Sequence, residues 1–308
     1  MRPRWLLGVL VAVLAVTGCS ASTASTGATG TDRPTVTVTT TILGDVVSEI
    51  VGDQADVVVL MPAGGDPHSF AISAQEAARL HASDLLVSNG LGLEEGITAQ
   101  VQAAAADGVP QLVAGEHVDP LTFAASGSTG LPDPHFWTDP DRVVMVVDAL
   151  EDTLATIGRI DADRVARRSA GYRAELGALA AEMDASFATI APEHRALVTN
   201  HHVFGYLAER FGFQVIGAVI PGGTTLAAPS AADLAELAAA VRATGVPAIF
   251  ADSSQPDRLA QVVADETGLD IQVVPLFTES LSPAGQGAGT YLELMRTNTS
   301  RITTALTR

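Results

Sequence analysis

Short apolar runs rich in β-branched residues alternate with stretches of helical periodicity from residue 35 onward. In the first half, the pattern predicts strands at 35–41, 56–61 and 84–88 and helices at 42–51 and 73–81. The second helix opens with Ser73-x-x-Glu76, a capping box that closes a helix N-terminus. Strands that alternate with helices favour an α/β lobe with a mainly parallel sheet.

The middle of the chain is helical, and the alternation then resumes. Thr138-Asp139-Pro140 is a plausible helix start, and helices are predicted at about 141–157 and 162–189, the second long enough to brace two lobes. The later strands are predicted at 196–199, 214–219, 248–251 and 271–276, and the later helices at 203–211, 230–244, 257–267 and 290–306. The expected fold class is therefore α/β, with two lobes of mainly parallel sheet joined by one long helix and a ligand cleft between them.

This alternation sets the expected domain limits. The first α/β lobe covers 35–150, a helical linker covers 151–190, and the second α/β lobe covers 191–308. A chain of 308 residues is long enough for two such lobes.

The residues before the first lobe have the features of an export signal. Arg2 and Arg4 precede an uncharged apolar run from Trp5 to Val16, which is too short to span a bilayer. Val16-Thr17-Gly18-Cys19 then resembles the lipobox of bacterial lipoproteins, in which the cysteine receives lipid. We expect a signal peptide at 1–18, lipidation at Cys19, a small polar tether at 19–34, and a protein anchored by lipid to the outer face of the cell membrane.

Composition narrows the function classes. Hydrophobic residues make up 47% of the chain and charged residues 17%, as in a globular protein. The 17 basic residues are all arginine and face 35 acidic residues, for a net charge of −18, so a nucleic-acid partner is not expected. The absence of lysine excludes Schiff-base chemistry and a P-loop.

Three of the seven histidines stand in loops at the ends of predicted elements. His68 and His135 each close an Asp-Pro-His triplet, and His201 follows a predicted strand. Imidazole is the commonest metal ligand, and three from separate loops could converge in a cleft. Glu279, just beyond the last predicted strand, is the candidate carboxylate to complete four-coordination.

Several segments together resemble one family. They are the two Asp-Pro-His loops and the segments 199–207, 228–234, 249–254 and 276–281. These segments are similar to those of the zinc- and manganese-binding lipoproteins of ABC-type importers, the cluster 9 or cluster A-I solute-binding proteins, and the likeness runs from about residue 35 to 306.

The resemblance implies a metal ion held between two lobes by His68 and His135 from the first and by His201 and Glu279 from the second. It also implies delivery of the metal to an ABC-type membrane permease, and we expect a monomer. Glu279 departs from the family's usual aspartate, which leaves its mode of coordination open. Zinc-specific members often carry a histidine-rich loop between the first two ligands, but residues 116–134 contain a single histidine, His117. The alignment at His201 could also shift by one residue, to His202.

Several functions remain open at this stage. Three neutral imidazoles and one carboxylate suit Zn²⁺, whereas Mn²⁺ prefers more oxygen donors, so a zinc receptor is the first hypothesis and a manganese receptor the alternative. An exported zinc hydrolase with Glu279 as general base is the rival of another class, although the sequence has no His-Glu-x-x-His motif. A purely adhesive surface protein would need no metal. With unperturbed pKa values near 6.5, three imidazoles would lose a metal to protons through roughly pH 6.

Overall fold

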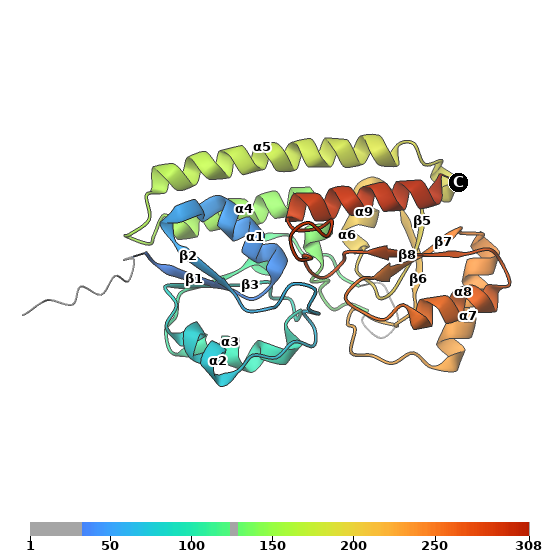
Figure 1. The fold of residues 1–308 in the computed structure, drawn as a ribbon, viewed down its shortest axis with the longest axis horizontal. Helices are drawn as coiled ribbons and strands as arrows, with labels where there is room; N and C mark the ends of the chain where they lie inside the picture. The colour runs from blue at the N-terminus through green and yellow to red at the C-terminus, as the bar shows by residue number, and fades with distance from the viewer. Residues whose placement is uncertain (1–32, 124–128, 308) are drawn as a thin grey trace, which may run out of the picture. The chain divides into compact units, whose positions relative to one another are not determined.

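The computed structural model describes residues 33–123 and 129–307 (Figure 1). The expected signal peptide, the lipidation site Cys19 and nearly all of the tether lie outside these residues. Across the two described ranges, every helix is too short or too polar to serve as a membrane span.

Two four-stranded sheets, both entirely parallel, form the centres of two lobes (Figure 1). The first has the order β2-β1-β3-β4, with β1 at Thr35–Val38, β2 at Asp56–Val59, β3 at Leu85–Ser88 and β4 at Gln111–Val113. The second has the order β6-β5-β7-β8, with β5 at Ala196–Thr199, β6 at Gln214–Ala218, β7 at Ala248–Asp252 and β8 at Gln272–Leu276. The second sheet thus repeats the strand order of the first, and the predicted fold class is confirmed.

Helices connect and cover the strands. The first lobe contains α1 (Thr41–Val51), α2 (Ala74–His81) and α3 (Thr98–Ala106), and the second contains α6 (Gly205–Phe211), α7 (Ala231–Thr244) and α8 (Arg258–Thr267). The capping box before α2 is confirmed, because Ser73 Oγ accepts from Glu76 N while the Glu76 carboxylate accepts from Ser73 N.

A layer of three helices runs over both lobes. It consists of α4 (Pro140–Leu154), α5 (Ala162–Phe187) and α9 (Tyr291–Leu306), and α5 packs against α1, α4 and α9 (Figure 1). The 26 residues of α5 give a rod of about 39 Å at 1.5 Å per residue. Its buried side chains, including Val165, Tyr172, Leu176, Leu179 and Met183, follow helical spacing along one face.

One apolar core extends through both lobes and this helical layer. Its members include Val36 and Val87 from the first sheet, Leu197 and Phe250 from the second, and Leu176 from α5. The long helix therefore does more than connect the lobes, because its apolar face belongs to the core that they share.

One prediction from the pattern was wrong, and two elements were not predicted. The β-branched run 35–41 does not continue as a strand, since β1 ends at Val38 and Thr40 caps α1, accepting from Leu43 N at 3.4 Å. Helix α3 and strand β4 were not predicted at all. Helix α3 is alanine-rich with only Ala104 buried, and β4 has three residues, so neither has a clear periodicity.

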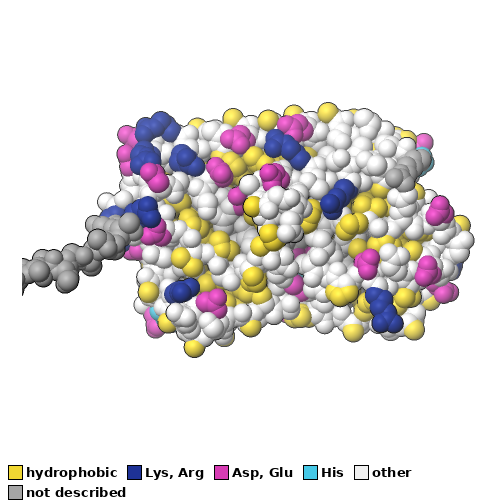
Figure 2. Space-filling view, viewed as in Figure 1, with side chains coloured by type: hydrophobic (Ala, Val, Ile, Leu, Met, Phe, Trp, Pro, Cys, Tyr) yellow, Lys and Arg dark blue, Asp and Glu magenta, His cyan; other side chains and the backbone are white. Residues whose placement is uncertain are grey.

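Charged side chains are mixed on the surface. On the face drawn in Figure 2, arginines lie among acidic side chains. Arg173 of α5, for example, pairs with Asp148 and Glu151 of α4 at 2.6 Å each. The acidic net charge thus coexists with local ion pairs that join neighbouring helices.

Candidate metal centre

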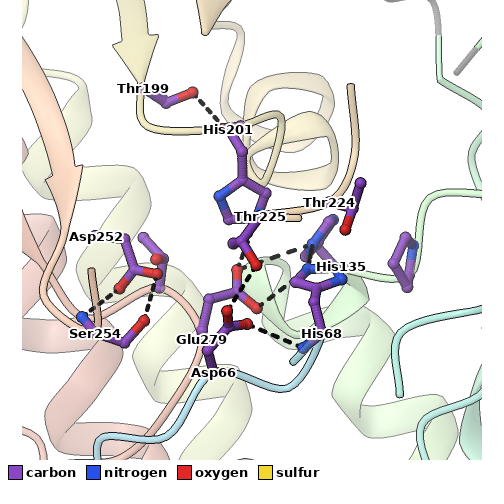
Figure 3. Close-up of polar contacts among 12 residues, drawn as sticks. Asp66, His68, His135, Thr199, His201, Thr224, Thr225, Asp252, Ser254 and Glu279 are labelled. Atoms are coloured by element: carbon purple, nitrogen blue, oxygen red, sulfur yellow. Dashed lines mark hydrogen bonds and ion pairs between the residues drawn. The ribbon is translucent and has the colours of Figure 1, made fainter. Parts of the chain in front are cut away.

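The four side chains predicted as ligands meet at the carboxyl ends of the two sheets, where open α/β sheets bind ligands (Figure 3). His68 lies in the loop after β2, His201 lies two residues after β5, and Glu279 lies three residues after β8. His135 lies just before the short 3₁₀ turn that leads into α4. All four are at most 1% exposed.

The donor atoms are close enough to surround a single ion. His68 Nε2 lies 3.4 Å from His135 Nε2, and His201 Nε2 lies 3.1 Å from Glu279 Oε1. The carboxylate is 3.8 Å from His135 Nε2 and 3.9 Å from His68 Nε2. A tetrahedron of bonds of about 2.0–2.1 Å separates its corners by about 3.3–3.4 Å. The observed spacings of 3.1–3.9 Å lie on both sides of this value, and all four donor atoms lie within 4.8 Å of one another.

Several of these buried polar atoms have no hydrogen-bond partner. They are Nδ1 of His68, both ring nitrogens of His201 and both carboxylate oxygens of Glu279. An unpaired buried polar group costs about 1–3 kcal/mol, and such groups are rare in native proteins. Of these atoms, Nε2 of His201 and the Glu279 carboxylate face the cluster, beside Nε2 of His68 and His135, so the residues present fit a metal ion.

The repeated Asp-Pro-His triplets explain how two of the histidines are positioned. In each triplet the aspartate accepts the backbone N–H of the histidine two residues later, at 2.9 Å from Asp66 to His68 and 3.0 Å from Asp133 to His135. This Asx turn is a local property of the sequence. Asp133 also lies 2.7 Å from His135 Nδ1, which orients the ring with Nε2 toward the cluster.

Burial sets the charge state of the cluster. Desolvation lowers the pKa of His68 to about 4 and that of His135 to about 3, and it also lowers the pKa of His201. Desolvation raises the pKa of Glu279, although the nearby imidazoles of His135 and His68 lower it in part. Desolvation also raises the pKa of Asp133 to about 7. The three imidazoles are therefore neutral near pH 7, which is the form that binds metal.

These pKa values move the expected onset of proton competition away from pH 6. A buried imidazole whose pKa is lowered stays neutral until the pH falls close to that lowered value, so we expect little competition from the histidines between pH 7.5 and 6. Below its raised pKa, Glu279 alone makes affinity fall by at most about tenfold per pH unit, and the fall becomes steeper near pH 4, where His68 also takes up a proton.

The measurement is the zinc dissociation constant at several pH values, obtained by competition with a chelator whose own protonation is known. If the logarithm of the dissociation constant already changed by two or three units per pH unit at pH 6.5, the result would contradict this expectation.

The structure also places the other residues that sequence analysis singled out. The cluster contains His201, while the adjoining His202 is half-buried and not part of it. His117 is exposed at the end of a 3₁₀ turn. Trp137 is buried in the core and also borders the site, since its ring centroid lies 5.4 Å from that of His135. Its Nε1 donates a hydrogen bond to the carbonyl oxygen of Thr278 at 2.9 Å.

Sequence reasoning missed the polar contacts that join the lobes beside the cluster. Asp66 accepts from Thr225 Oγ1 of the second lobe at 2.6 Å (Figure 3). It also accepts from Gln255 Nε2, likewise of the second lobe, at 2.9 Å. Glu95 accepts from Thr224 Oγ1 at 2.7 Å. Asp66 had a local signal in its Asp-Pro-His triplet, but nothing in the sequence around the threonines indicates their partners.

Comparison with known proteins agrees with this architecture. Residues 36–305 match the family described as zinc-uptake complex component A, periplasmic (ZnuA). The chain belongs to this family. The resemblance noted from the sequence, to the binding proteins of ABC-type metal importers, is thereby confirmed.

Relatives of the chain carry the names of different metals. The zinc-binding protein TroA of Treponema pallidum is 29% identical over 303 residues, which are 97% of each chain. The manganese ABC transporter substrate-binding lipoprotein PsaA of Streptococcus anginosus is 25% identical over 308 residues, 98% of each. The solved structure of the Treponema protein superposes with a TM-score of 0.83 at 28% identity, covering 90% of this chain and all of that one. This family member thus shares its fold with a periplasmic zinc-binding protein.

Proposed function

We propose that this chain is an exported receptor that binds Zn²⁺ between its two lobes through His68, His135, His201 and Glu279 and delivers it to an ABC-type membrane permease. The observation that carries the proposal is the buried cluster of three imidazole nitrogens and one carboxylate with atoms left unpartnered. A donor set of three nitrogens and one oxygen favours zinc over manganese. The name of TroA supports zinc as well.

A manganese receptor is the second candidate, because the name of PsaA includes that metal. The two are separated by metal analysis of protein purified without chelator, followed by titration of Mn²⁺ against the zinc-loaded protein. We expect zinc to be retained and manganese to displace it only in large excess. Displacement at near-equal concentrations would favour manganese as the cargo.

The buried site supports a receptor rather than a zinc hydrolase. Catalytic zinc sites keep one position for an exchangeable water beside three protein ligands. In the proposed site Glu279 would fill the fourth position, because it is 1% exposed and its carboxylate lies within 4 Å of a ring nitrogen of each of the three histidines. We therefore propose that the chain is not an enzyme and carries its metal enclosed. That it acts as a monomer is a separate proposal, taken from the family resemblance.

Attachment to the cell membrane is proposed to depend on Cys19. In cells, Cys19→Ala should abolish fatty-acid labelling and move the protein from the membrane fraction to the medium or the soluble extracytoplasmic fraction, because the tether at 19–34 has no apolar stretch to hold it. Ser20→Ala is the matched control and should remain in the membrane fraction. Membrane retention with continued labelling of Cys19→Ala would refute the proposed anchor.

A further inference from the structure

The two ligand histidines of the first lobe differ in what their Nδ1 atoms face. His135 Nδ1 lies 2.7 Å from Asp133, whereas Nδ1 of His68 is buried without a hydrogen-bond partner. Metal-ligating imidazoles almost always donate their second N–H to a carboxylate, a carbonyl or a water, and that bond fixes the ring. The Nε2 of His68 faces the other donors, so a neutral ring bound through Nε2 carries its proton on Nδ1. A metal-bound His68 therefore needs a hydrogen-bond acceptor beside its Nδ1.

The carboxylate of Glu95 lies at that position. Its Oε1 is 3.7 Å from His68 Nδ1, beyond hydrogen-bond range but within reach of a small side-chain shift, and the side chain is 43% exposed. The same Oε1 accepts from Thr224 Oγ1 of the second lobe at 2.7 Å. The next residue, Gly96, lets this backbone approach the His68 loop closely, because a Cβ there would lie 2.2 Å from the carbonyl oxygen of Phe70.

We propose that Glu95 is a positioning residue of the metal centre, whose carboxylate accepts the Nδ1–H of His68 when a metal ion is bound at Nε2. Thr224 holds this carboxylate from the opposite lobe, so the same oxygen joins a ligand histidine to the second lobe. The inference rests on the proposed function, since it assigns a role at the same metal centre. It predicts that removal of the Glu95 carboxylate weakens metal binding because His68 is less well oriented, although all four proposed ligands are still present.

The test uses the chain with Zn²⁺ for affinity and Co²⁺ for spectroscopy. Glu95→Ala should weaken zinc binding about tenfold, the lower end for loss of such an outer hydrogen bond. Glu95→Gln should stay within about threefold of wild type, because its amide oxygen still accepts. Glu116→Ala, which removes another exposed carboxylate of the first lobe, is the matched control and should change affinity less than twofold.

In the Co²⁺-loaded protein, the Nδ1–H protons of bound imidazoles give strongly shifted NMR signals that exchange with water. One of these signals should be lost to fast exchange in Glu95→Ala and kept in Glu95→Gln, a difference that a general structural role would not produce. Thr224→Val should weaken zinc binding about threefold in the wild-type background and leave Glu95→Ala unchanged, because the two residues then act through one interaction.

Equal zinc affinity in Glu95→Ala and Glu116→Ala, or an unchanged set of Co²⁺-shifted signals, would overturn this inference while the metal-receptor function stands. A wild-type protein that binds neither metal would overturn both.

Discussion

His201→Ala is expected to remove most of the zinc-dependent rise in melting temperature, whereas His202→Ala is expected to leave it largely intact. A metal that binds only the native state stabilises it in proportion to the logarithm of the ratio of metal concentration to dissociation constant. Loss of one of four ligands should weaken binding at least about a hundredfold, which removes about 2.7 kcal/mol of that stabilisation. His202 lies next to this proposed ligand in the chain but outside the cluster.

The comparison is made by thermal unfolding of metal-free and zinc-saturated protein for wild type and both variants. The adjoining histidines form a matched pair, because each change removes one imidazole from the same loop. Greater damage from His202→Ala would place the ligand one residue later than proposed. Full zinc-dependent shifts in both variants would mean that the metal binds elsewhere.

Glu279→Ala should separate metal binding from stability of the fold. Both oxygens of this carboxylate are buried without hydrogen-bond partners, and burial raises its pKa, so in the metal-free protein it is held in an unfavourable environment. We therefore expect the metal-free variant to melt at or above the wild-type temperature. Its zinc-dependent shift should shrink strongly, because the only anionic ligand of the cluster is gone.

Glu279→Asp is the conservative companion to this change. It introduces the aspartate that the family resemblance implies at this position, and we expect it to keep zinc binding within about tenfold of wild type. Zinc affinity measured by chelator competition, together with melting temperature, checks both variants. A metal-free Glu279→Ala protein that is strongly destabilised, or that binds zinc as tightly as wild type, would contradict the role given to this carboxylate.

Much of the arrangement could be predicted from local patterns in the sequence. Strands such as 196–199 are short β-branched or apolar runs, and α5 shows its buried face at helical spacing. His68 and His135 were found because each closes an Asp-Pro-His triplet, whose Asx turn forms within three residues. Such features can be predicted because they depend only on residues that are close together in the sequence.

The features that escaped prediction are those set by long-range packing. The bond from Gln255 to Asp66 joins residues 189 apart in sequence, and the bond from Thr224 to Glu95 joins residues 129 apart. The lowered imidazole pKa values likewise follow from burial, which no single segment encodes. For that reason the sequence suggested that protons compete for the histidines near pH 6, and the folded site indicates a lower onset for these three side chains.

The apolar core that continues from one sheet to the other through α5 has a consequence for cooperativity. Lobes that share no apolar packing can unfold one after the other. Here each lobe has a smaller cluster of its own, but removal of either sheet also exposes side chains of the larger core that both lobes share with the long helix. The described part of the chain should therefore unfold in a single calorimetric transition. Metal binding at the junction of the lobes should then slow amide hydrogen exchange in the strands of both sheets, including those far from the metal.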